Sequence, residues 1–174
     1  MCSRSFGREV HRYPELREAV LTYISRAAEK LRGEESVAAA VQVFIQTNPF
    51  KDVPQYSRSV TVALTSASDD TLSLARAAVH GLQAIYKPGF AYKKAGTKLT
   101  GLSPKATRQI NLFDDVEMLS RRDRLNTALD GVNLRFGRDT LRLAGAGVSR
   151  GWRMQRQRLS PAYTTDWQSL PVVR

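Results

Sequence analysis

The 174-residue chain contains one cysteine, Cys2, and two histidines, His11 and His80. A single cysteine cannot form a disulfide within the chain, which favours a protein of the reducing cytoplasm. Neither histidine has a cysteine or carboxylate partner at the spacing typical of metal sites, so we expect no bound metal. These scarcities exclude a disulfide-stabilised domain and argue against a zinc site.

Long apolar runs are also missing. No stretch approaches the roughly 20 apolar residues that a transmembrane helix needs, and no secretory signal pattern opens the sequence. The apolar fraction of 42% is nevertheless normal for a globular domain. We therefore expect one ordinary core with an appendage, and no membrane partner.

Acidic side chains are scarce, with 16 against 27 basic ones and a net charge of +11. Residues 1–100 hold 14 basic and 9 acidic side chains, residues 101–118 hold 2 and 3, and residues 119–174 hold 11 and 4. Two basic regions thus flank a slightly acidic centre. Such a charge attracts a polyanion, most commonly nucleic acid, although basicity can also serve solubility alone.

Two amphipathic helices are predicted from apolar residues at helical spacing. Residues 14–32 form the first, with the apolar stripe Leu16, Ala19, Val20, Ile24, Ala27 and Leu31. The second follows Ser68 and ends at residues 87–89, with the stripe Leu72, Ala75, Val79, Leu82 and Ile85. Asp69 and Asp70 fall where carboxylates cap a helix, so we interpret them as capping residues rather than catalytic ones.

Four strands accompany the helices, at residues 3–10, 40–47, 57–64 and 90–100. In the second, Val41, Val43 and Ile45 alternate with polar or outward positions, and residues 48–56 between the second and third strands contain two prolines, as a hairpin loop does. The order is β-α-β-β-α-β. We therefore predict an α+β fold, in which a four-stranded antiparallel sheet carries two helices on one face.

The other face of this sheet is expected to be free of helices and rich in hydroxyls, glycines and cations, groups that hydrogen-bond phosphate without reading bases. An ordinary solvated sheet is the alternative. The candidate DNA-binding residues are Ser3, Arg4, Ser5, Phe6, Gly7, Ser57, Arg58, Ser59, Lys93, Lys94, Gly96 and Thr97, and Thr47 and Lys98 are expected nearby.

Residues 101–118 show no lasting periodicity and read as a linker. Within it lies the pentapeptide Gln109, Ile110, Asn111, Leu112 and Phe113, followed by two aspartates. A buried strand here would have to bury those carboxylates as well. We interpret the pentapeptide as an exposed binding motif, in which Gln109 hydrogen-bonds at the mouth of a partner's pocket and Leu112 and Phe113 are the apolar anchors.

The remaining residues 119–174 form a basic extension. A helix is predicted up to Phe136, with Leu125, Ala128 and Val132 at helical spacing and Gly137 as its stop. Beyond it, aromatic residues are scattered among arginines, with too few apolar residues in register for a large core. We expect an arm that packs on another surface or orders on binding.

Several segments together resemble the C-terminal part of the UmuC type of Y-family translesion DNA polymerase, the catalytic subunit of DNA polymerase V. They are SRSFG at residues 3–7, IYKPGFAYKKAG at 85–96, QINLF at 109–113 and LSPAYTTDW at 159–167. The resemblance implies that residues 1–100 are a little finger domain lying on the template-primer duplex. It also implies that QINLF binds the sliding clamp and that 119–174 is a C-terminal extension.

The same resemblance implies partners and a setting: duplex DNA, the sliding clamp, a UmuD-type accessory dimer and the RecA filament, in SOS-induced DNA repair and mutagenesis. The parent polymerases use magnesium ions held by palm carboxylates. The chain lacks a palm, so we expect no catalytic residues, no cofactor of its own and no activity alone. We therefore expect a natural truncation or a fragment.

Two other functions fit the same fold class. A single-stranded RNA-binding module would need stacking aromatics on its central strands, which the sequence YKKAGTKL at 92–99 lacks. An acylphosphatase-like hydrolase would need an anion-binding loop after the first strand, with a placed arginine and asparagine. No glycine-rich loop of that kind follows residues 3–10.

Overall fold

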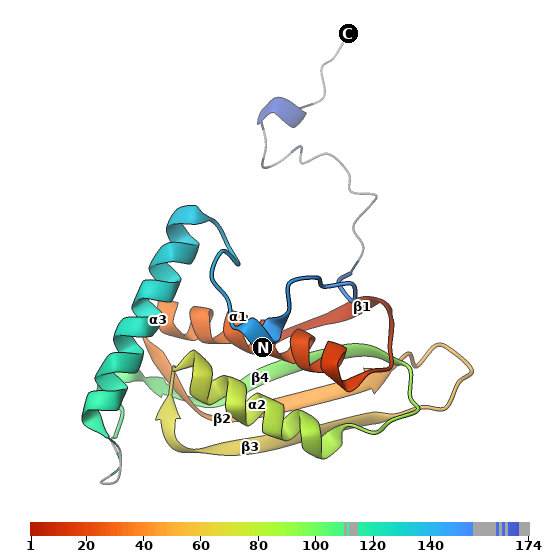
Figure 1. Ribbon diagram of the computed structural model, residues 1–174, viewed down its shortest axis with the longest axis horizontal. Helices are drawn as coiled ribbons and strands as arrows, with labels where there is room; N and C mark the ends of the chain where they lie inside the picture. Colours follow the sequence, from red (N-terminus) through yellow and green to blue (C-terminus); the bar gives the residue numbers. More distant parts are fainter. Residues whose placement is uncertain (110, 112–114, 155–162, 164, 166, 171–174) are drawn as a thin grey trace.

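The computed structural model describes residues 1–109, 111, 115–154, 163, 165 and 167–170 (Figure 1). Its elements are β1 (Cys2–Val10), α1 (Tyr13–Gly33), β2 (Ser36–Thr47), β3 (Ser57–Ser68), α2 (Thr71–Ile85), β4 (Tyr92–Pro104), α3 (Val116–Phe136) and the short 3-10 helices η1 (Lys105–Thr107), η2 (Ala144–Ala146) and η3 (Trp167–Ser169). The predicted β-α-β-β-α-β order is confirmed. So is the hairpin loop between β2 and β3.

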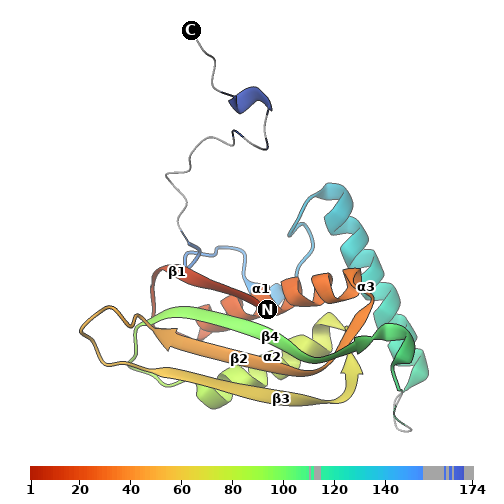
Figure 2. The same cartoon turned by 180° about the vertical axis from the view of Figure 1, so that it is seen from behind.

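The four strands form one antiparallel sheet in the order β1-β4-β2-β3. Helices α1 and α2 lie side by side on one face, and the opposite face is turned to the viewer in Figure 2. The predicted α+β fold with two helices on a single face is therefore confirmed. None of the helices in the described part combines the length and apolar character needed to cross a bilayer.

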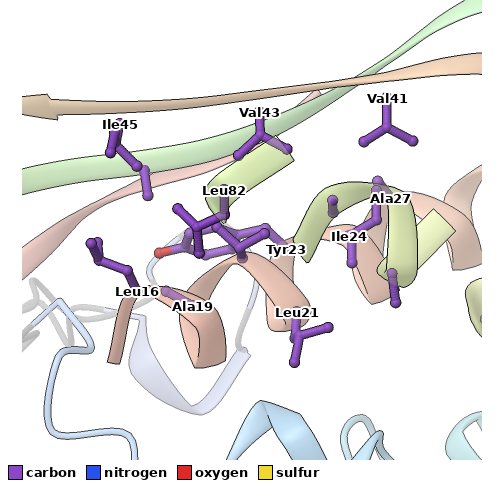
Figure 3. Close-up of a cluster of buried hydrophobic side chains, with 14 of the residues drawn as sticks. Leu16, Ala19, Leu21, Tyr23, Ile24, Ala27, Val41, Val43, Ile45 and Leu82 are labelled. Atoms are coloured by element: carbon purple, nitrogen blue, oxygen red, sulfur yellow. The ribbon is translucent and has the colours of Figure 1, made fainter. Parts of the chain in front are cut away.

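The core lies between this sheet and the two helices. Val41, Val43 and Ile45 of β2 are fully buried and point toward α1, where Leu16 and Ile24 are buried as well (Figure 3). Alternation in the strand and 3.6-residue spacing in the helix bring both apolar sets to one interface. Each buried side chain of this size contributes about 1.5–3 kcal/mol from removal of apolar surface from water.

The apolar stripe of α2 differs from the predicted one. Leu74 and Ala78 are fully buried, whereas Leu72 and Val79 are only partly buried. The stripe is rotated because α2 packs against both α1 and the β2–β3 side of the sheet. Gly81 shows how close this packing is: a Cβ there would meet the side chain of Val60 at 3.2 Å.

Strand β4 extends four residues beyond the predicted end at Thr100. Its last residues pair with the start of β2, from Leu102 opposite Ala38 to Pro104 opposite Ser36. Gly101 permits this continuation because it adopts φ +62°, where residues with a Cβ are strained. The segment predicted as a linker from residue 101 therefore begins in strand, and η1 follows at Lys105.

Helix α3 begins at Val116, earlier than the prediction of a helix beyond Leu119, because Asp115 caps it by accepting a hydrogen bond from Met118 N at 3.0 Å. Its predicted apolar stripe is not buried: Leu125 is 53% exposed and Phe136 is 66% exposed. The buried residue of the helix is Asn126 instead. Polar contacts rather than apolar packing therefore dock α3 against the domain.

These polar contacts gather at the start of α2. Asp70 caps α2 by accepting from Ser73 N at 2.9 Å, which confirms its predicted capping role, and it also accepts from Asn126 Nδ2 at 3.1 Å and Arg122 Nη1 at 3.3 Å. Arg32 of α1 forms a two-pronged ion pair with Asp130, at 2.6 and 2.7 Å. A guanidinium and a carboxylate matched in this way fix orientation as well as distance.

The segment that follows α3, residues 138–154, turns back across the outer side of α1 and reaches β1 (Figure 1). Trp152 is 3% exposed and stands edge-on to Phe6 of β1 and Tyr23 of α1. Gly7 N also donates to the carbonyl of Trp152 at 3.1 Å. This part of the basic extension therefore packs on the helical side of the domain and along one sheet edge.

Candidate nucleic-acid interface

The sheet face opposite α1 and α2 has a composition set by strand register. Residues paired across strands share a face, and positions two apart along a strand do so too. Gln42 faces Lys98 and Thr61, Phe44 faces Gly96 and Ser59, and Gln46 faces Lys94 and Ser57. We call the resulting set the open face: Ser3, Ser5, Gln42, Phe44, Gln46, Ser57, Ser59, Thr61, Lys94, Gly96 and Lys98.

None of the three α-helices lies over the open face (Figure 2). Its two lysines, Lys94 and Lys98, stand two residues apart on β4, one of the two central strands. Hydroxyl groups of Ser3 and Ser5 accompany them on β1, and those of Ser57, Ser59 and Thr61 on β3. The open face thus presents two cations with hydroxyl donors on either side. None of the residues that define it is acidic.

The middle of the open face is closely packed. A Cβ at Gly96 would meet the ring of Phe44 at 2.5 Å and would collide with Ser3, whereas opposed Cβ atoms in a sheet usually stand about 4.5–5.5 Å apart. Lys94 Nζ lies 6.0 Å from the centre of the same ring. Gly96 thus allows Phe44 to lie flat between the strands, and the ring positions the Lys94 ammonium group through a cation–π contact.

Six of the twelve predicted DNA-binding residues lie together on the open face. They are Ser3, Ser5, Ser57, Ser59, Lys94 and Gly96. Arg4 and Arg58 do not join them, because they alternate with these serines and so belong to the helical side of β1 and β3. Arg4 pairs with the buried Ala95 and Arg58 with the buried Ile45. The sequence SRS occurs twice, and each time only its serines reach the open face.

The remaining predicted residues have other surroundings. Phe6 and Thr97 are buried, at 1% and 0% exposure, on the core side. Lys93 donates to the Phe6 carbonyl at 2.7 Å and so bridges β4 to β1, while Gly7 bonds to Trp152 through its backbone. Thr47, expected nearby, is also buried, where Gln55 and Tyr56 contact its hydroxyl. The side chains of these residues are therefore not arranged for one shared surface.

Phe44, Gln42, Gln46 and Thr61 are open-face residues that were absent from the predicted set. The outward position of the three β2 residues follows from alternation with Val41, Val43 and Ile45, and that of Thr61 from alternation with Val60 and Val62 on β3, so the signal was present in the sequence. What the sequence did not give is the register between strands, which places Phe44 over Gly96. The RNA-binding alternative requires two or three stacking aromatic rings on the central strands. Phe44 is the one aromatic residue among the open-face residues, so this requirement is not met by that set.

The predicted clamp-binding motif falls largely outside the described residues. Ile110, Leu112 and Phe113 are not described, whereas Gln109 and Asn111 are exposed. The motif follows η1 and precedes the cap of α3. Its proposed role in clamp binding stays a prediction.

Asp69 and Asp70 were both predicted to be capping residues rather than catalytic ones, and of the two Asp70 caps α2. Asp69 forms an ion pair with Lys105 at 2.8 Å, and Asp70 is committed to the α2 cap and Asn126. Within the described part of the chain, no three or more His, Cys, Asp or Glu side chains are grouped as metal ligands. The described carboxylates therefore do not fit the magnesium ions of a polymerase palm.

Known proteins match the chain along its whole length. Residues 1–112 match the C-terminal domain of the impB/mucB/samB family, and residues 123–173 match a Domain of unknown function (DUF4113). The chain belongs to the impB/mucB/samB family. This membership confirms the resemblance to the C-terminal part of UmuC-type Y-family polymerases.

Individual relatives agree with the family. Protein UmuC of Salmonella typhimurium is 41% identical over 175 residues, covering 100% of this chain and 42% of that protein. Protein MucB of Escherichia coli is 40% identical over 172 residues, covering 98% of this chain and 40% of that protein. DNA polymerase IV of Desulfatibacillum aliphaticivorans is 33% identical over 138 residues, covering 79% of this chain and 34% of that protein. The chain thus spans about two fifths of the length of its UmuC and MucB relatives.

Proposed function

We propose that this chain is the duplex-binding and clamp-tethering region of a translesion polymerase of the impB/mucB/samB family. The observation that carries the proposal is the open face, where Lys94 and Lys98 stand between hydroxyl-bearing strands with no helix above them. Its parent enzyme would act in SOS-induced DNA repair and mutagenesis in the cytoplasm. The chain itself would contribute binding and no chemistry.

Contact through the open face would be independent of sequence. Lysines and hydroxyls bind phosphate oxygens, and phosphate contacts carry no sequence information. Each phosphate that a lysine neutralises releases condensed counterions, so the affinity would fall steeply as salt rises. This behaviour suits a polymerase that must hold duplexes of any sequence next to a lesion.

The motif at Gln109–Phe113 would bind the sliding clamp and keep the polymerase at the primer terminus. Tethering raises the local concentration of the enzyme without altering its chemistry. A UmuD-type accessory dimer and the RecA filament are further partners in this proposal. They rest on the family resemblance, and no residue of the chain is assigned to them.

The open face is tested by a double substitution, Lys94→Ala with Lys98→Ala. We expect duplex affinity at low salt to fall about tenfold or more, because two charge-assisted contacts are lost. The slope of log affinity against log salt should fall by about 2, since each phosphate contact contributes about 0.9. Fluorescence anisotropy with a labelled duplex across a salt series measures both quantities.

A matched control removes the same charge elsewhere. Arg76 on α2 and Arg124 on α3 are exposed and lie away from the open face. Their double alanine variant should keep nearly the parent slope. Equal losses in the two double variants would show that net charge alone drives binding, and a clear preference for single-stranded RNA over duplex DNA would favour the RNA-binding alternative.

A further inference from the structure

A second cationic region lies on the helical side of the domain and extends to the β1 edge of the sheet. A cavity of about 730 Å³, open on one side, lies between the start of β1, the outer side of α1, the end of α3 and the segment 138–154, with Thr71 of α2 also in its lining. Its volume falls within the range of small-molecule binding sites, about 300–1,000 Å³. Both family regions, residues 1–112 and 123–173, contribute to its walls.

Basic side chains dominate these walls, with seven lysines and arginines against two carboxylates. The carboxylates are already paired: Glu29 with Arg26 at 2.5 Å, and Asp139 with Arg150 at 2.8 Å. Four more cations of the lining, Arg4, Lys30, Arg138 and Arg142, form no ion pair within the described part of the chain. These four side chains are exposed, so solvent screens part of their mutual repulsion, and Arg142 is also close enough to Asp139 to lower its pKa. The net positive charge of the lining still favours an anion in the concavity.

Two buried polar atoms of the lining also have no hydrogen-bond partner among the described residues. They are the hydroxyl of Tyr23, whose residue is 7% exposed, and Nε of Arg150, whose side chain is 5% exposed. Burial raises the pKa of Tyr23 to about 12, although Arg4 and Arg153 nearby act to lower it. Tyr23 therefore keeps its proton, and a buried hydroxyl without a partner is a costly state that a ligand oxygen would relieve.

We propose that this cavity binds a phosphate group, carried either by a single strand of nucleic acid or by a small phosphorylated molecule. Arginine presents a planar fork of donors that matches phosphate oxygens, and several arginines converge here. The Tyr23 hydroxyl and the Arg150 Nε would supply further donors. This site shares only Ser3 with the open face, and it gives the segment 138–154 a binding role.

The position of Trp152 allows binding to be followed directly. Trp152 lines the cavity, whereas the second tryptophan, Trp167, is 88% exposed. In a Trp167→Phe background, Trp152 is the single tryptophan of the chain. Pyrophosphate and a short single-stranded oligothymidylate, titrated separately, should each change Trp152 emission saturably if the site accepts both sources of phosphate. Response to the oligothymidylate alone would identify a nucleic-acid strand, and response to pyrophosphate alone a small phosphorylated molecule.

Substitutions in this background locate the site. Arg142→Ala and, separately, Arg138→Ala should weaken binding about tenfold, the effect of losing one charge-assisted hydrogen bond. Both residues are exposed, and thermal melting checks that the variants fold. Probe binding should be unchanged in Arg76→Ala and in the Lys94→Ala, Lys98→Ala double variant, because these residues lie outside the cavity. The proposal is overturned if neither probe gives a saturable change, or if Arg76→Ala weakens binding as much as both cavity variants do.

Discussion

Changing Leu112 and Phe113 together to alanine should remove measurable binding to the purified sliding clamp. In small interfaces a few apolar or aromatic anchors carry most of the free energy, about 2 kcal/mol or more each. Two such losses weaken binding by roughly a thousandfold. The exposed Gln109, whose proposed role is one hydrogen bond at the pocket mouth, should have a smaller effect when changed to alanine, about tenfold. Surface plasmon resonance on immobilised clamp measures all three affinities.

The chain offers a control of the same composition. Leu125 and Phe136 of α3 are 53% and 66% exposed, so their double alanine variant removes the same two side-chain types from the surface. Clamp affinity should be unchanged in that variant. If the clamp binds the Leu112, Phe113 variant as tightly as the parent, the motif has no tethering role.

Asp70→Ala should lower the free energy of unfolding by about 3–5 kcal/mol, the usual effect of removing one partner from a buried charged network. Asp70 is 4% exposed and joins three elements: it caps α2, and it accepts from Asn126 and Arg122 of α3. Without the Asp70 carboxylate, the Asn126 amide stays buried but loses the acceptor of its hydrogen bond. Urea denaturation followed by circular dichroism measures the change.

A second capping residue, Asp115, allows the capping contribution of Asp70 to be distinguished from the contribution of its contacts with α3. Asp115 caps α3 in the same way, through Met118 N, but it is exposed, and among the described residues it accepts no hydrogen bond from the domain core. Asp115→Ala should therefore cost only about 1 kcal/mol, the typical value of a helix cap. A loss of similar size in both variants would mean that the contacts from Asp70 to α3 add nothing to stability.

The Asp70 contribution also has a defined pH dependence. Burial acts to raise the pKa of Asp70, but hydrogen bonds from Ser73 and Asn126, with the nearby Arg122, outweigh it and hold the pKa below its ordinary value. A carboxyl whose folded pKa is depressed stabilises the protein fully above its unfolded pKa, about 3.9, and less as pH falls through the folded value. The stability difference between the parent and Asp70→Ala should thus be constant near neutral pH and shrink below about pH 4.

Sequence periodicity was sufficient to predict the helices and strands that bury one regular face. Val41, Val43 and Ile45 defined their strand, and Leu16 and Ile24 the stripe of α1, because local spacing alone decides which side is apolar. Pairing between strands was not available from spacing. It decided that β4 continues to Pro104 and that Phe44 lies opposite Gly96.

Docking of the extension was beyond prediction for a different reason. The apolar stripe expected on α3 is exposed, and the helix is held instead by Asn126 and by the Arg32–Asp130 pair, whose members lie 98 residues apart in the sequence. Polar contacts at such separation leave no periodic signal in either segment. Trp152 is a similar case, since its burial depends on Phe6 and Tyr23 from the first two elements.

The central claim is that duplex DNA lies on the open face of the sheet. Adding a short duplex to the isotopically labelled chain and following backbone amide resonances tests it most directly. Duplex binding to this face should give the largest shifts on residues 94–100 of β4 and 57–61 of β3, with small changes along Thr71–Ile85 of α2. The largest shifts on α1 and α2, with β3 and β4 unaffected, would contradict it.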